Sequence, residues 1–161
     1  MELPKTLITE NTLTTWTSAI EITSGIDASY NSYEFLVMNA RGNSTVDTNF
    51  LIGQSGTYSV RDNSISRYGA NTNFNSYFGP FITTSAGVRL LLRAVFLRPS
   101  GSSYYKTAFV HGGSNFVNSS YASSIVLAET TQSTAAVDRV RFTVSGGAWA
   151  AGTRYKLYGY E

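Results

Sequence analysis

The ten residues from Val88 to Leu97 constrain the fold of this chain more than any other segment. Apolar side chains occupy every even position from Val88 to Phe96, which is the period-two pattern of a strand with one face in a core. The odd positions carry Arg89, Leu91, Arg93, Val95 and Leu97, where a solvent-facing strand would carry Ser or Thr. The segment is therefore predicted to be a strand with one buried face and one face of mixed Arg and apolar character.

The same period recurs along the chain, and helical periodicity is almost absent. Further strands are predicted at Leu13–Ile22, Tyr33–Asn39, Val46–Gly53, Tyr104–Val110, Tyr121–Leu127, Val137–Val144 and Thr153–Tyr160. Between Gln54 and Gly87 the pattern predicts only short strands and long loops. Roughly eight or nine strands separated by turn residues predict an all-β fold, an antiparallel two-sheet β-sandwich, with a jelly roll as its expected form.

The chain is long enough for one domain. Its 161 residues are expected to form a single sandwich over residues 13–161, preceded by a short N-terminal arm over residues 1–12. The arm is predicted because Met1–Thr12 precedes the first periodic segment, and terminal segments stay loose unless something ties them down. Such an arm would be flexible or bound to a partner.

Composition removes several classes of chemistry. The chain has no cysteine and one histidine, so disulfides, thiolate metal sites and cysteine nucleophiles are excluded. A net charge of +2 comes from 12 Lys and Arg spread along the chain against 10 acids, which is not a nucleic-acid-binding patch. No apolar run approaches the ~20 residues of a membrane-spanning helix. No nucleic acid, membrane, metal or cofactor is expected as a partner.

Catalytic patterns are equally sparse. His111–Ser114 contains the His-Gly-Gly of a lipase oxyanion loop, but a strand-end histidine before a Gly-Gly turn is the expected interpretation. Gly53–Gly56 only partly matches a nucleophile elbow, which needs Gly-x-Ser-x-Gly between a strand and a helix. No two of the acids lie within four residues of each other, so a glycosidase pair could form only across strands. The chain is not expected to be an enzyme.

The mixed face of the Val88–Leu97 segment indicates a protein interface. Arg outnumbers Lys nine to three, and the planar guanidinium of Arg suits interfaces because it binds carboxylates bidentately. The candidate interface residues are Arg89, Leu91, Arg93, Val95, Arg139 and Arg141. The alternative is that loops of the chain itself cover this face.

Aromatic residues give a second candidate surface. They make up 14% of the chain, and exposed rings can serve as stacking platforms for sugars. The candidates for glycan contact are the loop residues Tyr58, Tyr68, Tyr77, Phe78 and Trp149. Trp149 lies in the small-residue segment Gly146–Gly152, which would expose it, and the alternative is that its ring packs over the end of the sandwich.

Two stretches resemble a family of small virion proteins of tailed bacteriophages. The first is Ile22–Phe35, a strand, a turn and a strand, and the second runs from Ala136–Phe142 through Ser145–Gly147 to Ala151–Gly159. The shared motifs are glycine turns between alternating strands, so the resemblance implies no catalytic residue. It implies a β-sandwich built into a phage particle, at the capsid or at a tail appendage.

Of these two sites, the length of the chain favours a capsid decoration or cement protein, because a receptor-binding fibre is expected to carry a long trimerising shaft or a tail-attachment domain, and only about a dozen residues precede the first predicted strand. Such a protein would be made in the host cytoplasm and would bind the major capsid protein of the same phage on the outside of the head, as a homotrimer. The alternative is a tail appendage or fibre component that binds host-surface carbohydrate.

Overall fold

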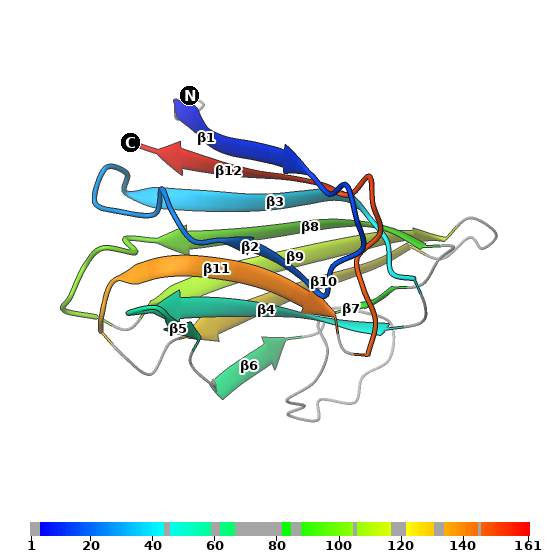
Figure 1. The fold of residues 1–161 in the computed structure, drawn as a ribbon. Coiled ribbons are helices and arrows are strands. Elements are labelled where there is room, and N and C mark those ends of the chain that lie inside the picture. The colour runs from blue at the N-terminus through cyan, green and yellow to red at the C-terminus, as the bar shows by residue number, and fades with distance from the viewer. Residues whose placement is uncertain are drawn as a thin grey trace.

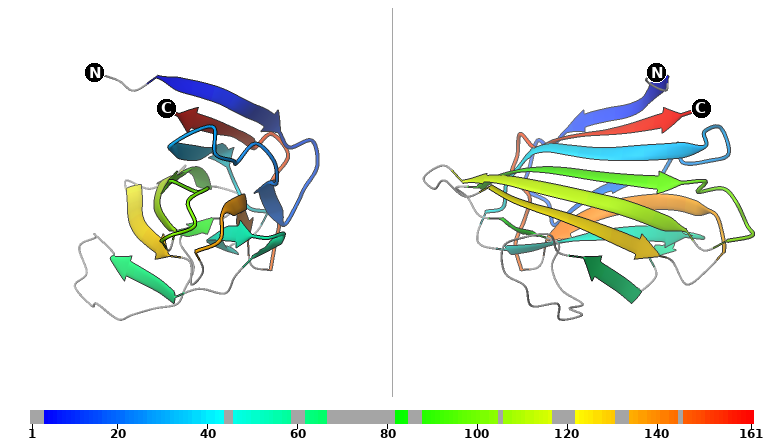
Figure 2. Two further views of the ribbon diagram at one scale, coloured as in Figure 1. Left: turned by 90° about the vertical axis from the view of Figure 1, so that its left-hand side faces the viewer. Right: turned by 180° about the vertical axis from the view of Figure 1, so that it is seen from behind.

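The structure is a computed structural model that describes residues 4–43, 46–58, 62–66, 82–84, 88–104, 106–116, 122–130, 134–144 and 146–161. Within these ranges every regular element is a strand, and the strands form two antiparallel sheets that face each other (Figures 1 and 2). The predicted all-β sandwich of two antiparallel sheets is confirmed, whereas the jelly roll stays a prediction.

The larger sheet has β8 in its middle. In the described chain its seven strands run in the order β1 (Lys5–Thr12), β12 (Arg154–Tyr160), β3 (Ser32–Ala40), β8 (Val88–Leu97), β9 (Thr107–Phe116), β10 (Ala122–Thr130) and β6 (Asp62–Ser66). All neighbours are antiparallel. Because β1 pairs with β12, the two ends of the chain lie beside each other at one edge (Figure 1).

The smaller sheet is built around β11. Its described strands run in the order β2 (Ala19–Ile22), β11 (Val137–Val144), β4 (Val46–Gln54) and β5 (Thr57–Tyr58), and β7 (Ile82–Thr84) also pairs with β4. Ser55 and Gly56 both have positive φ, 52° and 80°, which makes the β4–β5 connection a two-residue hairpin of the type that matches strand twist. The partial elbow motif at Gly53–Gly56 is therefore a hairpin turn.

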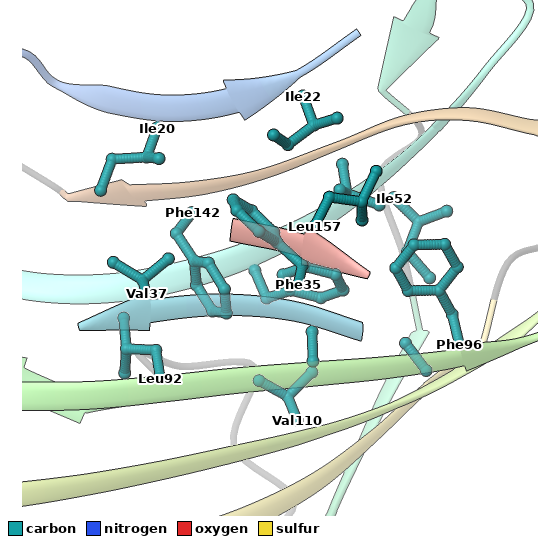
Figure 3. Packing of buried hydrophobic residues seen from close by; sticks show 14 of the residues in the cluster. Ile20, Ile22, Phe35, Val37, Ile52, Leu92, Phe96, Val110, Phe142 and Leu157 are labelled. Carbon is teal, nitrogen blue, oxygen red and sulfur yellow. The ribbon is translucent and has the colours of Figure 1, made fainter. Parts of the chain in front are cut away.

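The core lies between the two sheets. The even face of β8 is buried at Leu90, Leu92, Ala94 and Phe96, as its alternation predicts. Phe142 of β11 contacts Phe35 of β3, in the other sheet, at a ring separation of 5.3 Å. Because Phe35 and Phe142 come from different sheets, the Phe142 ring joins the two layers (Figure 3). Within its own sheet Phe142 also contacts Phe50 of β4, at 4.9 Å. Such ring pairs contribute about 0.5–1.5 kcal/mol each beyond the area that they bury.

The predicted N-terminal arm needs correction. Lys5–Thr12 form β1, an edge strand that pairs with β12 from Lys5 opposite Tyr160 to Thr12 opposite Arg154. The strand predicted at Leu13–Ile22 is correspondingly shorter, because only Ala19–Ile22 are regular and Trp16 is 52% exposed. Backbone pairing with β12, together with Ile8 packing against the core, ties the N-terminal segment to the sheet.

Candidate interaction surfaces

The outer face of β8 is open, as its odd positions predict. Leu91 is 54% exposed and Leu97 is 52% exposed, Arg89 and Arg93 are also exposed, and Val95 is half-buried. The register of β8 with β9 places Phe109 opposite Val95, and Phe109 is 43% exposed. We call Leu91, Val95, Leu97 and Phe109 the apolar patch. Among the described residues, no loop of the chain covers the apolar patch.

A buried carboxylate lies beside the apolar patch and binds Arg93. Glu34 on β3 stands opposite Val95 and is only 6% exposed. Arg93 Nε donates to Glu34 Oε1, and the Tyr160 hydroxyl donates to Glu34 Oε2. Burial of the phenol, together with this hydrogen bond to Glu34, raises the pKa of Tyr160 to about 12. Arg93 therefore acts first as the counter-ion of Glu34, and only its remaining donors are open to a partner.

A second network holds β1 at the edge of the same sheet. Glu10 Oε1 accepts hydrogen bonds from Arg154 Nη2 at 2.8 Å and from Lys156 Nζ at 3.1 Å. The hydrogen bonds from Lys156 and Arg154 lower the pKa of Glu10. Lys5 Nζ lies 4.6 Å from the centroid of the Tyr158 ring, a cation–π contact at the other end of β1.

The remaining two interface candidates lie on the opposite side of the sandwich. Arg139 and Arg141 belong to β11 in the smaller sheet, so the structure does not bring them together with Arg89 and Arg93. Arg139 Nε donates to Asp138 Oδ1 at 3.0 Å, and the backbone N–H of Gly56 donates to Asp138 Oδ2 at 2.8 Å. Asp138 thus joins Arg139 to the β4–β5 hairpin, and its hydrogen bond raises the pKa of Arg139.

Tyr58 contacts Arg141 and Glu21 on the smaller sheet and is not free to stack on a sugar. Its ring centroid lies 3.9 Å from Cζ of Arg141, and its hydroxyl donates to Glu21 Oε1 on β2. Burial, and next the hydrogen bond to Glu21, raise the pKa of Tyr58. One residue from the predicted glycan set and two from the predicted interface set therefore form one surface, which the sequence did not indicate.

Trp149 is buried, and the prediction that its loop exposes it is wrong. The residue has 0% exposure, and its Nε1 donates to the carbonyl of Phe142 at 3.2 Å. Its backbone exchanges two hydrogen bonds with Thr17, which closes the small-residue loop over the end of the sandwich. Trp149 is therefore unavailable for stacking on a sugar. Tyr68, Tyr77 and Phe78 lie outside the described residues.

The residues considered for catalysis or metal binding do not form a site in the described part of the chain. His111 is exposed in the middle of β9, and Gly112 and Gly113 continue that strand rather than forming the predicted turn. Within the described ranges no three His, Asp or Glu side chains gather as metal ligands. Those ranges also contain no helix long and apolar enough to cross a membrane.

Comparison of the chain with protein-family models, with curated proteins and with solved structures finds no match in any of the three.

Proposed function

We propose that this chain is a structural protein of a tailed-phage particle, a capsid decoration or cement protein that binds the outside of the head. The single observation that carries the proposal is the apolar patch on the outer face of the larger sheet. Apolar side chains that are about half exposed and grouped around charged residues are typical of surfaces that bind another protein. The patch would bind the major capsid protein or a sister subunit of a homotrimer.

The strand order supports the same proposal. With β5, β6 and the β9–β10 hairpin set aside, the other strands of the described chain can be numbered one to eight. They then pair in the orders 1-8-3-6 and 2-7-4-5. These orders support the predicted jelly roll, an architecture of two Greek keys that capsid and lectin domains share. We call these eight strands the frame.

Two of the five candidates for glycan contact are occupied within the chain itself. Trp149 is in the core, and one face of the Tyr58 ring is occupied by Arg141. A tail location with sugar binding is therefore the outcome that the experiment below must distinguish from capsid binding.

A cement protein needs no chemical step. Its contacts release binding free energy only when the coat subunits stand in the assembled lattice, so by linkage it stabilises the shell against the pressure of packaged DNA. The networks around Glu34 and Glu10 support this role, because they fix side chains of the larger sheet before a partner binds.

The test locates the protein and then removes the patch. Cryo-electron microscopy of virions of the phage that encodes the chain is expected to show many copies on the head. Leu91→Ser, Leu97→Ser and Phe109→Ser together are expected to lower head occupancy at least about tenfold with little change in folding, since these side chains are exposed. Trp16→Ser is the matched control, because Trp16 is equally exposed but lies outside the patch.

Two results would overturn the proposal. A few copies at the tail would favour the appendage alternative, and unchanged head binding of the triple variant would show that the patch is not the interface. Arg93 is left intact in this design because its loss would leave the buried Glu34 carboxylate without its counter-ion, and the variant would then report on stability.

A further inference from the structure

Three arginines surround Leu91 on the outer face of the larger sheet. Arg89 and Arg93 stand two residues before and two residues after Leu91 on β8, about 7 Å away along the strand. Arg154 of β12 lies opposite Met38 of β3, which places it on the same face at about 10 Å, or two strand spacings, from β8. We call Arg89, Arg93 and Arg154 the arginine cluster. The cluster borders the apolar patch at Leu91, whose side chain is about half exposed.

The arginines of the cluster are more exposed than the acids that pair with them. Arg93 binds Glu34, but the Arg93 side chain is 48% exposed whereas the Glu34 side chain is only 7% exposed. Arg154 binds Glu10, and Arg154 is again the more exposed of the two. A molecule that approaches this face therefore reaches the guanidinium groups more readily than the carboxylates.

The outer face carries an excess of positive charge on its five strands β1, β12, β3, β8 and β9. The register places these cations at outward positions: Lys5, Arg89, Arg93, Arg154 and Lys156. The two acids at outward positions are Glu10 and Glu34, so five positive charges less two negative ones leave a net charge of +3. Beyond β9 the register adds one acid, Asp62 on β6, at the edge of the sheet that lies farthest from β12. Positive charge is thus concentrated beside Leu91, on the β12 side of the apolar patch.

We propose that the arginine cluster and the apolar patch together bind an acidic surface of a different protein, one in which carboxylates surround an apolar side chain. The carboxylates pair with the cluster, because a guanidinium binds a carboxylate through two parallel N–H bonds. The apolar side chain covers Leu91, which removes apolar surface of both partners from water. This inference rests on the proposed function only in taking the apolar patch as the interface.

Two other occupants match this face less well. A second copy of the same face brings the same arginines, and its acids are the less exposed members of the Arg93–Glu34 and Arg154–Glu10 pairs, so like charges would meet. A nucleic acid would neutralise the arginines, but it would place its phosphates against the exposed Leu91 side chain. An acidic protein surface satisfies both the charged and the apolar part of the face.

The experiment uses the isolated full chain and three synthetic peptides as probes. Each peptide has a central Leu-Phe-Leu segment between two runs of three Glu, three Lys or three Ser. The NMR signals of the methyl groups of Leu91, Val95 and Leu97 report binding at the patch. The Glu peptide is expected to bind at least about tenfold more tightly than the Ser peptide in about 50 mM NaCl, and the Lys peptide more weakly than either. About 500 mM NaCl is expected to remove most of this difference, because salt screens exposed charges.

Matched double variants test whether the position of the charge matters. Arg89→Gln with Arg154→Gln is expected to weaken binding of the Glu peptide at least about fivefold, while the ion pair of Lys156 still holds β1 to the sheet. Arg41→Gln with Arg139→Gln is the control, because it removes the same charge from the loop after β3 and from the smaller sheet. The control is expected to bind the Glu peptide as the unchanged chain does.

Four results would overturn the proposal. The Glu peptide could leave the methyl signals unchanged or bind no more tightly than the Ser peptide, and the two double variants could weaken binding equally, which would indicate general attraction. Tighter binding of a short DNA duplex than of the Glu peptide would assign the face to a nucleic acid. Self-association of the chain that Arg89→Gln with Arg154→Gln abolishes would assign it to a second copy. Because the test needs no virion, it can fail while the chain still binds the head, and the reverse also applies.

Discussion

Gly159 on β12 stands where any side chain would collide with a packed ring. A Cβ atom added there would lie 2.4 Å from Cγ and Cδ2 of Tyr30. The Tyr30 ring packs against the core and meets Tyr33 edge-on at a centroid separation of 5.6 Å. Ordinary carbon contacts are about 3.5–4.0 Å, so Gly159→Ala must displace the ring by roughly 1 Å or more.

The cost follows from what the displaced ring loses. Overpacking a core site costs about 1–3 kcal/mol, and a lost edge-on ring contact costs about 0.5–1.5 kcal/mol. Alanine recovers about 0.5–1 kcal/mol because it restricts the unfolded chain more than glycine does. We expect Gly159→Ala to lower the free energy of unfolding by about 2 kcal/mol, which lowers Tm by about 4–8 °C in a domain of this size.

Gly113→Ala is the matched control for this substitution. Gly113 also lies in a strand, β9, but nothing stands within 4 Å of an added Cβ. We expect this variant to be neutral or stabilised by up to about 1 kcal/mol. Urea and thermal unfolding of both variants give the comparison, and equal stability of the two would refute the reasoning.

A double-mutant cycle identifies the colliding group. In a Tyr30→Ala background the ring is gone, so Gly159→Ala should cost almost nothing. If the full cost of about 2 kcal/mol persists there, the collision with Tyr30 is not its cause.

Two further predictions concern other polar contacts. Lys106 is 3% exposed, and its ammonium donates to the carbonyls of Gly101, Tyr104 (2.8 Å) and Thr134 (3.1 Å). Because Lys106→Met leaves these carbonyls without their donor, it should lower the free energy of unfolding by about 2–4 kcal/mol. Urea titration measures this change, and a value below about 0.5 kcal/mol would contradict the prediction. Hydrogen bonds from Ser29 and Tyr33 lower the pKa of Asp27. The stability that the Asp27 carboxylate provides is therefore present above its ordinary pKa and is lost as the pH falls through the lowered value. Asp27→Asn should reduce the fall in Tm between about pH 4 and pH 2 in thermal melts, and an unchanged fall would contradict the prediction.

The alternation of apolar and polar residues predicts the central strands, because one face of each of these strands is buried. Val88–Leu97 and Val137–Val144 have the same bounds in the sequence prediction and in the structure. In β8 one face packs against the core, so every second residue is apolar. In β11 the alternation holds from Val140 to Val144, but the register shifts between Val137 and Arg139, so Val137 is buried out of phase with the rest of the strand. The edge strand β1 gives no such signal, since its residues are exposed or half-buried. Its attachment comes from backbone pairing with β12, from the ion pairs of Glu10 and from Ile8, which packs against the core.

The positions of Trp149, Tyr58 and Phe109 depend on the pairing of segments that are far apart in the sequence, so alternation along one segment does not predict them. The backbone N–H and carbonyl of Trp149 pair with the backbone of Thr17, which is far away in the sequence, and its Nε1 donates to the carbonyl of Phe142. The contact of Tyr58 with Arg141 depends on the β5–β4–β11 register, which no local pattern encodes. The odd positions of β8 predict three of the four residues of the apolar patch, but placing Phe109 beside them requires the pairing of β8 with β9.

The position of Phe109 bears on how the proposed interface arose within the fold. Phe109 lies on β9, and the β9–β10 hairpin stands between β8 and β11 in the chain. The eight strands of the frame pair with one another without the hairpin, which extends the larger sheet beyond β8. The hairpin therefore adds Phe109 beside Val95 and converts β8 from an edge of the frame into the centre of a wider face. The proposed interface and the core thus lie on opposite faces of β8, so changes to the patch are expected to alter partner binding while the core residues Leu92 and Phe96 keep the sandwich intact.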